Sequence, residues 1–162
     1  MSIQEYVRPQ AAELRRRLEE PRRFIQVVAG PRQVGKTTLV THVADTVGLR
    51  HVFASADEPT LRGYEWIETQ WEAARLRLRD RDAQGALLVL DEVFGSLDEE
   101  RRAAVVDLLR SLADRFPQVI LITHIGSVRE GFDRVVRVEL DSKNGIASIR
   151  DEAPGVSDGL AA

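Results

Sequence analysis

The segment that most restricts the fold is the eight-residue run GPRQVGKT at residues 30–37. The preceding residues, FIQVVA, are mostly apolar and β-branched, so they predict a buried strand at residues 24–29. The following residues predict a helix over residues 36–47 with Gly48 at its C-terminal cap. A strand, a glycine-containing loop and a helix in direct succession favour an α/β arrangement.

The chemistry of this loop is that of phosphate binding. Gly30 and Gly35 let the backbone curl so that successive N–H groups point inward, and the start of the helix adds positive potential. We expect Lys36 to reach the β- and γ-phosphates of a nucleotide, Thr37 to offer its hydroxyl to Mg²⁺, and Thr38 to approach the α-phosphate. The predicted nucleotide-binding residues are Gly30, Pro31, Arg32, Gln33, Val34, Gly35, Lys36, Thr37 and Thr38.

Predicted strands and helices alternate along the rest of the chain. Further strands are expected at residues 51–56, 86–90, 119–123 and 135–140, and an Asn144-Gly145 hairpin turn leads into residues 146–150. Helices are expected at residues 10–20 and 64–78, after a capping box of Ser96 and Glu99, and as a short helix or turn at 127–132. This order predicts a three-layer α/β/α P-loop NTPase fold with a mostly parallel sheet of about five strands.

Polar side chains follow two of the predicted strands. Asp91 and Glu92 come directly after the apolar run ALLVL, and His124 closes the strand VILIT. Ligands in parallel sheets bind where the strands end, so these residues are expected near the loop. Asp91, with Thr37, is the predicted Mg²⁺ anchor. Glu92 is expected to polarise the attacking water, and His124 to contact that water or the γ-phosphate, so that the predicted catalytic residues are Glu92, His124 and Lys36. The alternative is a structural role for the strand-end acids and the histidine.

Composition limits the other possibilities. The 162 residues are 43% hydrophobic and 30% charged, which predicts a single domain at residues 1–153 and a flexible tail at 154–162. A net charge of −3 does not favour nucleic acid, and the arginines of residues 10–20 are expected on a solvated face. No apolar run is long enough for a membrane span, and neither a signal sequence nor cysteine is present, so a cytoplasmic location is expected.

Two families are recognisable in the chain. Between residues 8 and 93 the segments EPRRFIQVVAGPRQVGKTTL, FASADEPT, WEAARL and LLVLDEV resemble bacterial and archaeal AAA-type ATPases with a GPRQVGKTT loop. Between residues 90 and 140 the segments LDEVFGSLDEERR, LLRSLADRFPQVILITHI and FDRVVRVELD resemble the C-terminal lobe of ABC-type ATPases of the SMC and Rad50 group. The two resemblances meet at the Walker B strand, as a natural or an engineered chimera would have them.

The second resemblance implies roles for particular residues. Asp91 and Glu92 correspond to the Walker B aspartate and the catalytic glutamate, residues 96–98 (Ser-Leu-Asp) to the D-loop, and His124 to the switch histidine. A D-loop implies a homodimer, but the sequence has no LSGGQ-like signature to complete one and no coiled coil to link it to DNA. No clear arginine finger is present either, and since such a residue contributes roughly 10³–10⁵ in rate, slow turnover is expected.

Three functions remain open from the sequence. The first is Mg²⁺-dependent ATP binding, with ADP as the product of weak hydrolysis. The second is a fold module, natural or designed, that binds nucleotide or phosphate without catalysis. The third, phosphoryl transfer to a small molecule, is disfavoured because no separate acceptor site or lid is recognisable in the sequence.

Overall fold

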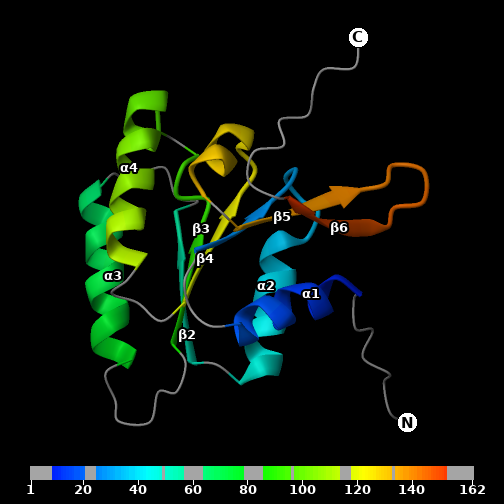
Figure 1. Ribbon diagram of the computed structural model, residues 1–162, viewed down its shortest axis with the longest axis horizontal. Coiled ribbons are helices and arrows are strands. Elements are labelled where there is room, and N and C mark those ends of the chain that lie inside the picture. The colour runs from blue at the N-terminus through cyan, green and yellow to red at the C-terminus, as the bar shows by residue number, and fades with distance from the viewer. Residues whose placement is uncertain are drawn as a thin grey trace.

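A computed structural model describes residues 9–20, 25–48, 50–56, 64–78, 86–95, 97–113, 118–132 and 134–152. Its centre is a six-stranded sheet in the order β2-β3-β4-β1-β5-β6 (Figure 1). The strands are β1 (Gln26–Ala29), β2 (Arg50–Ser55), β3 (Ala86–Asp91), β4 (Gln118–Thr123), β5 (Arg134–Leu140) and β6 (Ala147–Glu152). The helices are α1 (Pro9–Glu19), α2 (Lys36–Val47), α3 (Tyr64–Leu78), α4 (Glu99–Leu112) and the short 3₁₀ helix η2 (Gly126–Gly131).

Helices cover both faces of the sheet, which gives three layers (Figure 1). Successive residues of a strand point to opposite faces, and β1 divides its side chains in this way. Val27 packs with Trp71 of α3 and Leu109 of α4, whereas Val28 belongs to the cluster formed with α1 and α2. The α/β/α fold and the mostly parallel sheet are therefore confirmed, because the strands β1 to β5 all pair with one another in parallel orientation.

The sheet has six strands where about five were expected, because the segment expected after the hairpin turn pairs as a further strand. β6 pairs with β5 in antiparallel orientation and forms one edge of the sheet. The Asn144-Gly145 turn lies within a connection of residues 141–146, so β6 begins one residue later than expected. Gly145 has a φ of 70° in this turn, where a left-handed residue is required.

The first helix and the short 3₁₀ helix each begin one residue earlier than predicted, and the cap of α4 also differs. The N-cap of α4 is Asp98, whose carboxylate accepts a hydrogen bond from the Arg101 N–H at 2.8 Å, so the cap lies two residues after the predicted Ser96. Ser96 itself and the predicted tail at 154–162 lie outside the described residues. The helix at 36–47 with its Gly48 cap is confirmed. Within the described ranges, none of the helices has the length and apolar composition to cross a membrane.

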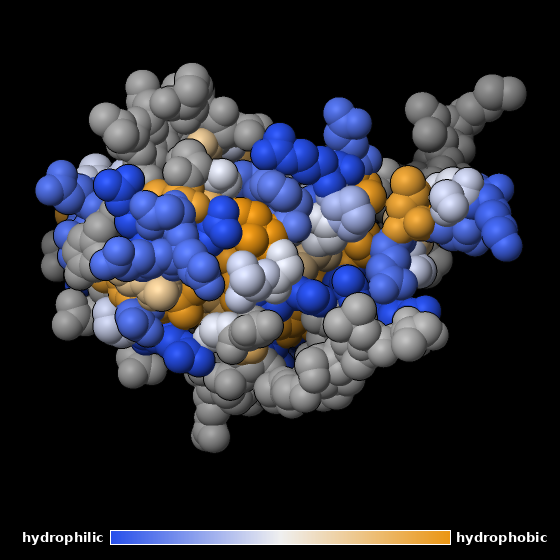
Figure 2. Space-filling model, turned by 90° about the horizontal axis from the view of Figure 1, so that it is seen from above, coloured by the Kyte–Doolittle hydropathy of each residue, from blue (hydrophilic) through white to orange (hydrophobic). Residues whose placement is uncertain are grey.

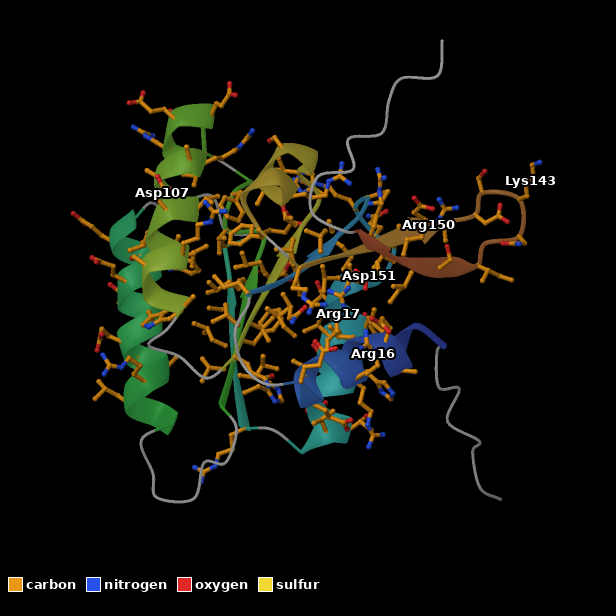
Figure 3. The ribbon with its side chains drawn as sticks, in the orientation of Figure 1. Arg16, Arg17, Asp107, Lys143, Arg150 and Asp151 are labelled. Atoms are coloured by element: carbon orange, nitrogen blue, oxygen red, sulfur yellow. The ribbon has the colours of Figure 1, made fainter. Side chains whose placement is uncertain are left out.

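A buried arginine connects the first helix to the last strand. Arg17 of α1 has a fully buried side chain, contrary to the expected solvated arginine face. Its guanidinium donates to Gln26 Oε1 of β1 at 3.1 Å and to Glu13 Oε1 at 3.1 Å, and it forms an ion pair with Asp151 of β6 (Figure 3). Arg17 therefore joins elements from both ends of the chain.

Replacement of this residue should weaken the fold. We expect Arg17→Ala to lower the free energy of unfolding by about 2 kcal/mol, because it removes a large buried side chain and leaves Gln26 without its donor. Urea denaturation measures the difference. Arg16→Ala is the matched control, since it removes the same charge from a side chain that is 56% exposed and should cost less than about 0.5 kcal/mol. Equal losses for the two variants would contradict a connecting role for Arg17.

Candidate functional site

The glycine loop lies where β1 ends, between β4 and β5. The Gly30 N–H donates to the Thr123 carbonyl of β4 at 3.2 Å. On the other side a Cβ atom at residue 30 would lie 2.3 Å from the carbonyl oxygen of Val138 in β5, so only glycine fits. Gly35 begins α2 with a φ of 88°, a conformation that favours glycine. The loop is thus held by both neighbouring strands before it enters the helix.

Lys36 fills the interior of this loop. Its side chain is only 5% exposed, and Nζ donates to the carbonyl oxygens of Gly30 at 2.9 Å and Pro31 at 2.6 Å. Glu92 Oε1 lies 4.0 Å from the same nitrogen. Burial lowers the pKa of Lys36 below its usual value, while the carboxylates of Glu92 and Asp91 oppose this change and Arg32 adds to it. The ammonium is therefore a buried cation with weak counter-charge, suited to an anionic partner.

Thr37 and Asp91 form a pair of oxygen atoms beside the lysine. The Thr37 hydroxyl donates to Asp91 Oδ2 at 2.8 Å and so connects the start of α2 with the end of β3. The Asp91 carbonyl accepts a hydrogen bond from the Ala56 N–H at 2.9 Å, which fixes the strand end against β2. Hydroxyl and carboxylate oxygens are the ligand types that Mg²⁺ prefers, so this pair fits the metal that such a fold implies.

Glu92 has an unusual backbone. Its φ of 54° is left-handed, which costs a residue with a side chain about 1–2 kcal/mol. The Glu92 N–H donates to the Ile122 carbonyl at 2.9 Å, and this hydrogen bond to β4 holds the conformation. The side chain then reaches His124, with Oε2 and Nδ1 separated by 2.6 Å. Strained residues of this kind concentrate at functional sites.

The predicted residues divide into two groups in the structure. Hydrogen bonds and short ionic distances join Lys36, Thr37, Asp91, Glu92 and His124, which come from α2, the end of β3 and the end of β4. Pro31, Arg32, Gln33 and Thr38 are exposed at the surface of the loop and the first turn of α2. Val34 differs, because its side chain packs into the core cluster with residues of α1 and α2.

Two features of the site are not among the predicted residues. Thr123 is fully buried, its hydroxyl accepts a hydrogen bond from the Ile125 N–H at 3.1 Å, and its carbonyl holds Gly30. A threonine at the end of the apolar strand VILIT was the available signal. The close approach of the Val138 carbonyl to Gly30 could not be predicted from the sequence, because the backbone carbonyl of any residue type at position 138 could make this contact.

Known proteins resemble the chain in two ways. A family model described as "AAA domain" matches residues 22–142. The DNA double-strand break repair Rad50 ATPase of Thermococcus kodakarensis is 40% identical over 70 residues, which are 43% of this chain and 8% of that protein. The chelated iron transport system membrane protein YfeB of Yersinia pestis is 41% identical over 56 residues, or 34% of this chain and 19% of that protein. The predicted resemblance to both ATPase groups is confirmed.

The chain covers only a small part of the length of these relatives. The chain spans less than a tenth of the Thermococcus protein, and the Archaeoglobus fulgidus Rad50 ATPase, 39% identical over 64 residues, is covered to 7%. A solved structure of an SmcHead bound to the C-winged helix domain of ScpA shares 21% identity over 41% of this chain and 20% of the other, with a TM-score of 0.37.

The buried position of Lys36 leads to a titration that can be measured. The chain contains only two lysines, Lys36 and the exposed Lys143, so their ε-methylene NMR signals can be assigned with one variant. We expect the Lys36 signals to report a pKa below the usual lysine value, because burial disfavours the charged form. Glu92→Gln should lower the pKa of Lys36 further, because Glu92 is the carboxylate that does most to raise this pKa.

Lys143 provides the internal reference for this titration, since it lies at the exposed turn of the β5–β6 connection. Glu100→Gln is the matched control variant, because it removes an exposed carboxylate from the first turn of α4. If Lys36 keeps the usual lysine pKa, or if Glu92→Gln raises that pKa, the electrostatic description of the loop is wrong.

Proposed function

This chain belongs to the AAA domain family, and we propose that it binds ATP together with Mg²⁺ and hydrolyses the nucleotide slowly. The observation that supports the proposal is that two sets of contacts, among Lys36, Glu92 and His124 and between Thr37 and Asp91, lie next to each other at the glycine loop. Lys36 lies 4.0 Å from Glu92, Glu92 contacts His124 at 2.6 Å, and Thr37 contacts Asp91 at 2.8 Å. These distances support a single site rather than separate structural pairs.

The loop supplies the affinity for phosphate in this proposal. Lys36 now satisfies its ammonium with two neutral carbonyl oxygens, and a phosphate oxygen with negative charge would be a stronger acceptor. The first N–H groups of a helix such as α2 have no partners within the helix, so they are further donors for the phosphate oxygens. Thr37 and Asp91 would hold Mg²⁺, which supplies neutralisation of phosphate charge when it is bound.

Glu92 and His124 supply the hydrolytic part of the proposal. The Glu92 carboxylate is the group that can accept a proton from an attacking water, and its left-handed backbone directs it toward Lys36. His124 acts on the same carboxylate from β4 and so sets its orientation. The sequence contains no clear arginine finger, and slow turnover follows because no further cation is supplied to the transition state.

The second candidate function is nucleotide binding without catalysis. The observation that favours it is the engagement of Glu92, since one carboxylate oxygen faces His124 and the other faces Lys36. A carboxylate that keeps both partners when ATP is bound cannot also orient a water. Measurement of turnover separates this function from the first.

Loss of the loop cation should abolish nucleotide binding. We expect saturating ATP with Mg²⁺, at about 100 times its dissociation constant, to stabilise the parent protein by roughly 2.7 kcal/mol. Lys36→Ala should remove this stabilisation, because the phosphates lose their buried counter-charge. Thermal unfolding with and without ATP measures both effects.

The controls for this experiment are a charge variant and removal of the metal. Arg15→Ala takes a positive charge from an exposed position of α1 and should keep the response to ATP. Chelation of Mg²⁺ by EDTA should weaken the response of the parent protein and leave Lys36→Ala unchanged. An undiminished ATP response in Lys36→Ala would refute the proposed binding mode.

Removal of the proposed base should separate hydrolysis from binding. We expect Glu92→Gln to bind ATP about as tightly as the parent and to release phosphate at least about tenfold more slowly, a typical loss for a missing general base. Phosphate release under saturating ATP measures the rate, and Glu100→Gln on the exposed side of α4 is the control. Equal rates in the parent and Glu92→Gln would leave the non-catalytic binding module as the function.

A further inference from the structure

Gln33 in the glycine loop has a left-handed backbone. Its φ is 62°, and within the described ranges only Gln33 and Glu92 combine a side chain with a positive φ. The Glu92 backbone is held by the hydrogen bond from its N–H to the Ile122 carbonyl. Gln33 has no such support, because none of the hydrogen bonds in the described part of the chain involves its backbone or its exposed side chain. Contacts within the protein therefore do not explain a glutamine at this position.

The shape of the loop does not require a glutamine either. A left-handed backbone is unfavourable for any residue with a Cβ atom and costs glycine little. Gly35, two residues later, adopts such a backbone with a φ of 88°. Glycine at position 33 would give the same turn at a lower free energy. The carboxamide of Gln33 is what the chain gains from the less favourable residue, and strained residues of this kind concentrate where ligands bind.

The exposed part of the loop is held at both ends. Gly30, which precedes residues 31–33, donates to the Thr123 carbonyl, and Val34, which follows them, is 7% exposed in the core cluster beside α2. β1 ends at the same edge of the sheet as β3 and β4, because these strands are parallel. Figure 2 views the molecule from that edge, and hydrophilic residues cover much of the visible surface. Gln33 therefore has a fixed place on a face suited to a charged ligand.

The position of Gln33 is close to the buried ammonium. Lys36 Nζ donates to the Pro31 carbonyl at 2.6 Å. Consecutive Cα atoms are about 3.8 Å apart, so the Cα of Gln33 lies within about 8 Å of the Cα of Pro31. A glutamine side chain is long enough to reach an anion bound to the ammonium from there. Under the proposed function, on which this step rests, the anion is the polyphosphate of ATP.

The carboxamide has the chemistry for such a contact. It carries two N–H donors, whereas phosphate oxygens are acceptors, and a hydrogen bond to a charged acceptor is stronger than one between neutral groups. We propose that Gln33 donates a hydrogen bond from Nε2 to an oxygen of the bound polyphosphate and so holds the ligand together with Lys36. The carboxamide is neutral, so it adds affinity without a further cation. The unfavourable backbone of Gln33 is compensated only when the ligand is bound.

Two variants separate the backbone from the carboxamide. Gln33→Gly removes both the carboxamide and the Cβ atom, whereas Gln33→Ala removes the carboxamide alone. In urea denaturation without ligand we expect the folding equilibrium constant of Gln33→Gly to be about fivefold larger than that of Gln33→Ala. The same pair of substitutions at Gln70, inside α3, is the matched control and should give the opposite sign, because glycine destabilises a helix relative to alanine. Equal constants for the two Gln33 variants would remove the strain on which the inference is based.

The contact with phosphate is tested by calorimetry. ATP and inorganic tripolyphosphate, each with Mg²⁺, are titrated into the parent protein and the variants. We expect Gln33→Gly and Gln33→Ala to bind both ligands about tenfold more weakly, since each loses a hydrogen bond to a charged acceptor. Gln70→Ala should keep both affinities. Variants of Gln33 that bind as tightly as the parent, or more tightly, would overturn the contact, and a loss limited to ATP would overturn its assignment to phosphate.

A second measurement uses the parent protein alone as the binding partner. The side-chain amide NMR signals of Gln33 are assigned by their absence from the Gln33→Ala spectrum. These signals should shift on addition of either ligand, while those of Gln70 remain in place. Gln33 signals that respond to neither ligand, although the parent binds both, would overturn the contact.

These outcomes distinguish failure of the contact from failure of the proposed function. A parent protein that binds neither ATP nor tripolyphosphate refutes nucleotide binding itself. A parent protein that binds both, with unchanged affinities in the Gln33 variants, refutes only the role of the carboxamide.

Discussion

The close approach of Gly30 to its two neighbouring strands is the contact on which the arrangement of the site depends. The β4 side supplies the Thr123 carbonyl that accepts the Gly30 N–H, and the β5 side supplies the Val138 carbonyl that excludes any Cβ atom. Because both contacts are made by backbone atoms of parallel strands, the loop has little freedom to move relative to the sheet. The ends of β3 and β4, which bring Asp91, Glu92 and His124, are consequently fixed with respect to Lys36.

Unfavourable electrostatics is the second constraint at this site. The ammonium of Lys36 is buried with neutral oxygens as its nearest partners, and the nearest carboxylate belongs to a residue with a left-handed backbone. Desolvation and backbone strain each cost folding free energy, and the fold compensates through its two apolar clusters on either side of the sheet. A site that is unfavourable without a ligand and improves with an anion is what a phosphate-binding loop requires.

Residues far from the loop contribute by holding the ends of the chain together. Arg17 connects α1, β1 and β6, so the strand β6 is attached to the helix α1 as well as to its sheet neighbour β5 (Figure 3). This attachment gives the hairpin of β5 and β6 a defined position relative to the loop.

The sequence by itself determined the fold class, the glycine loop and most of the strand and helix positions, because hydrophobic periodicity and glycine placement depend on local backbone geometry. It could also place Asp91, Glu92 and His124 at one edge of the sheet, since parallel strands end together. Only the tertiary structure decided the burial of Arg17 and the inward packing of Val34. The approach of Val138 to Gly30 belongs to the same group. Each of these depends on which residues distant in sequence come into contact, and the pattern of residue types along the chain does not record those contacts.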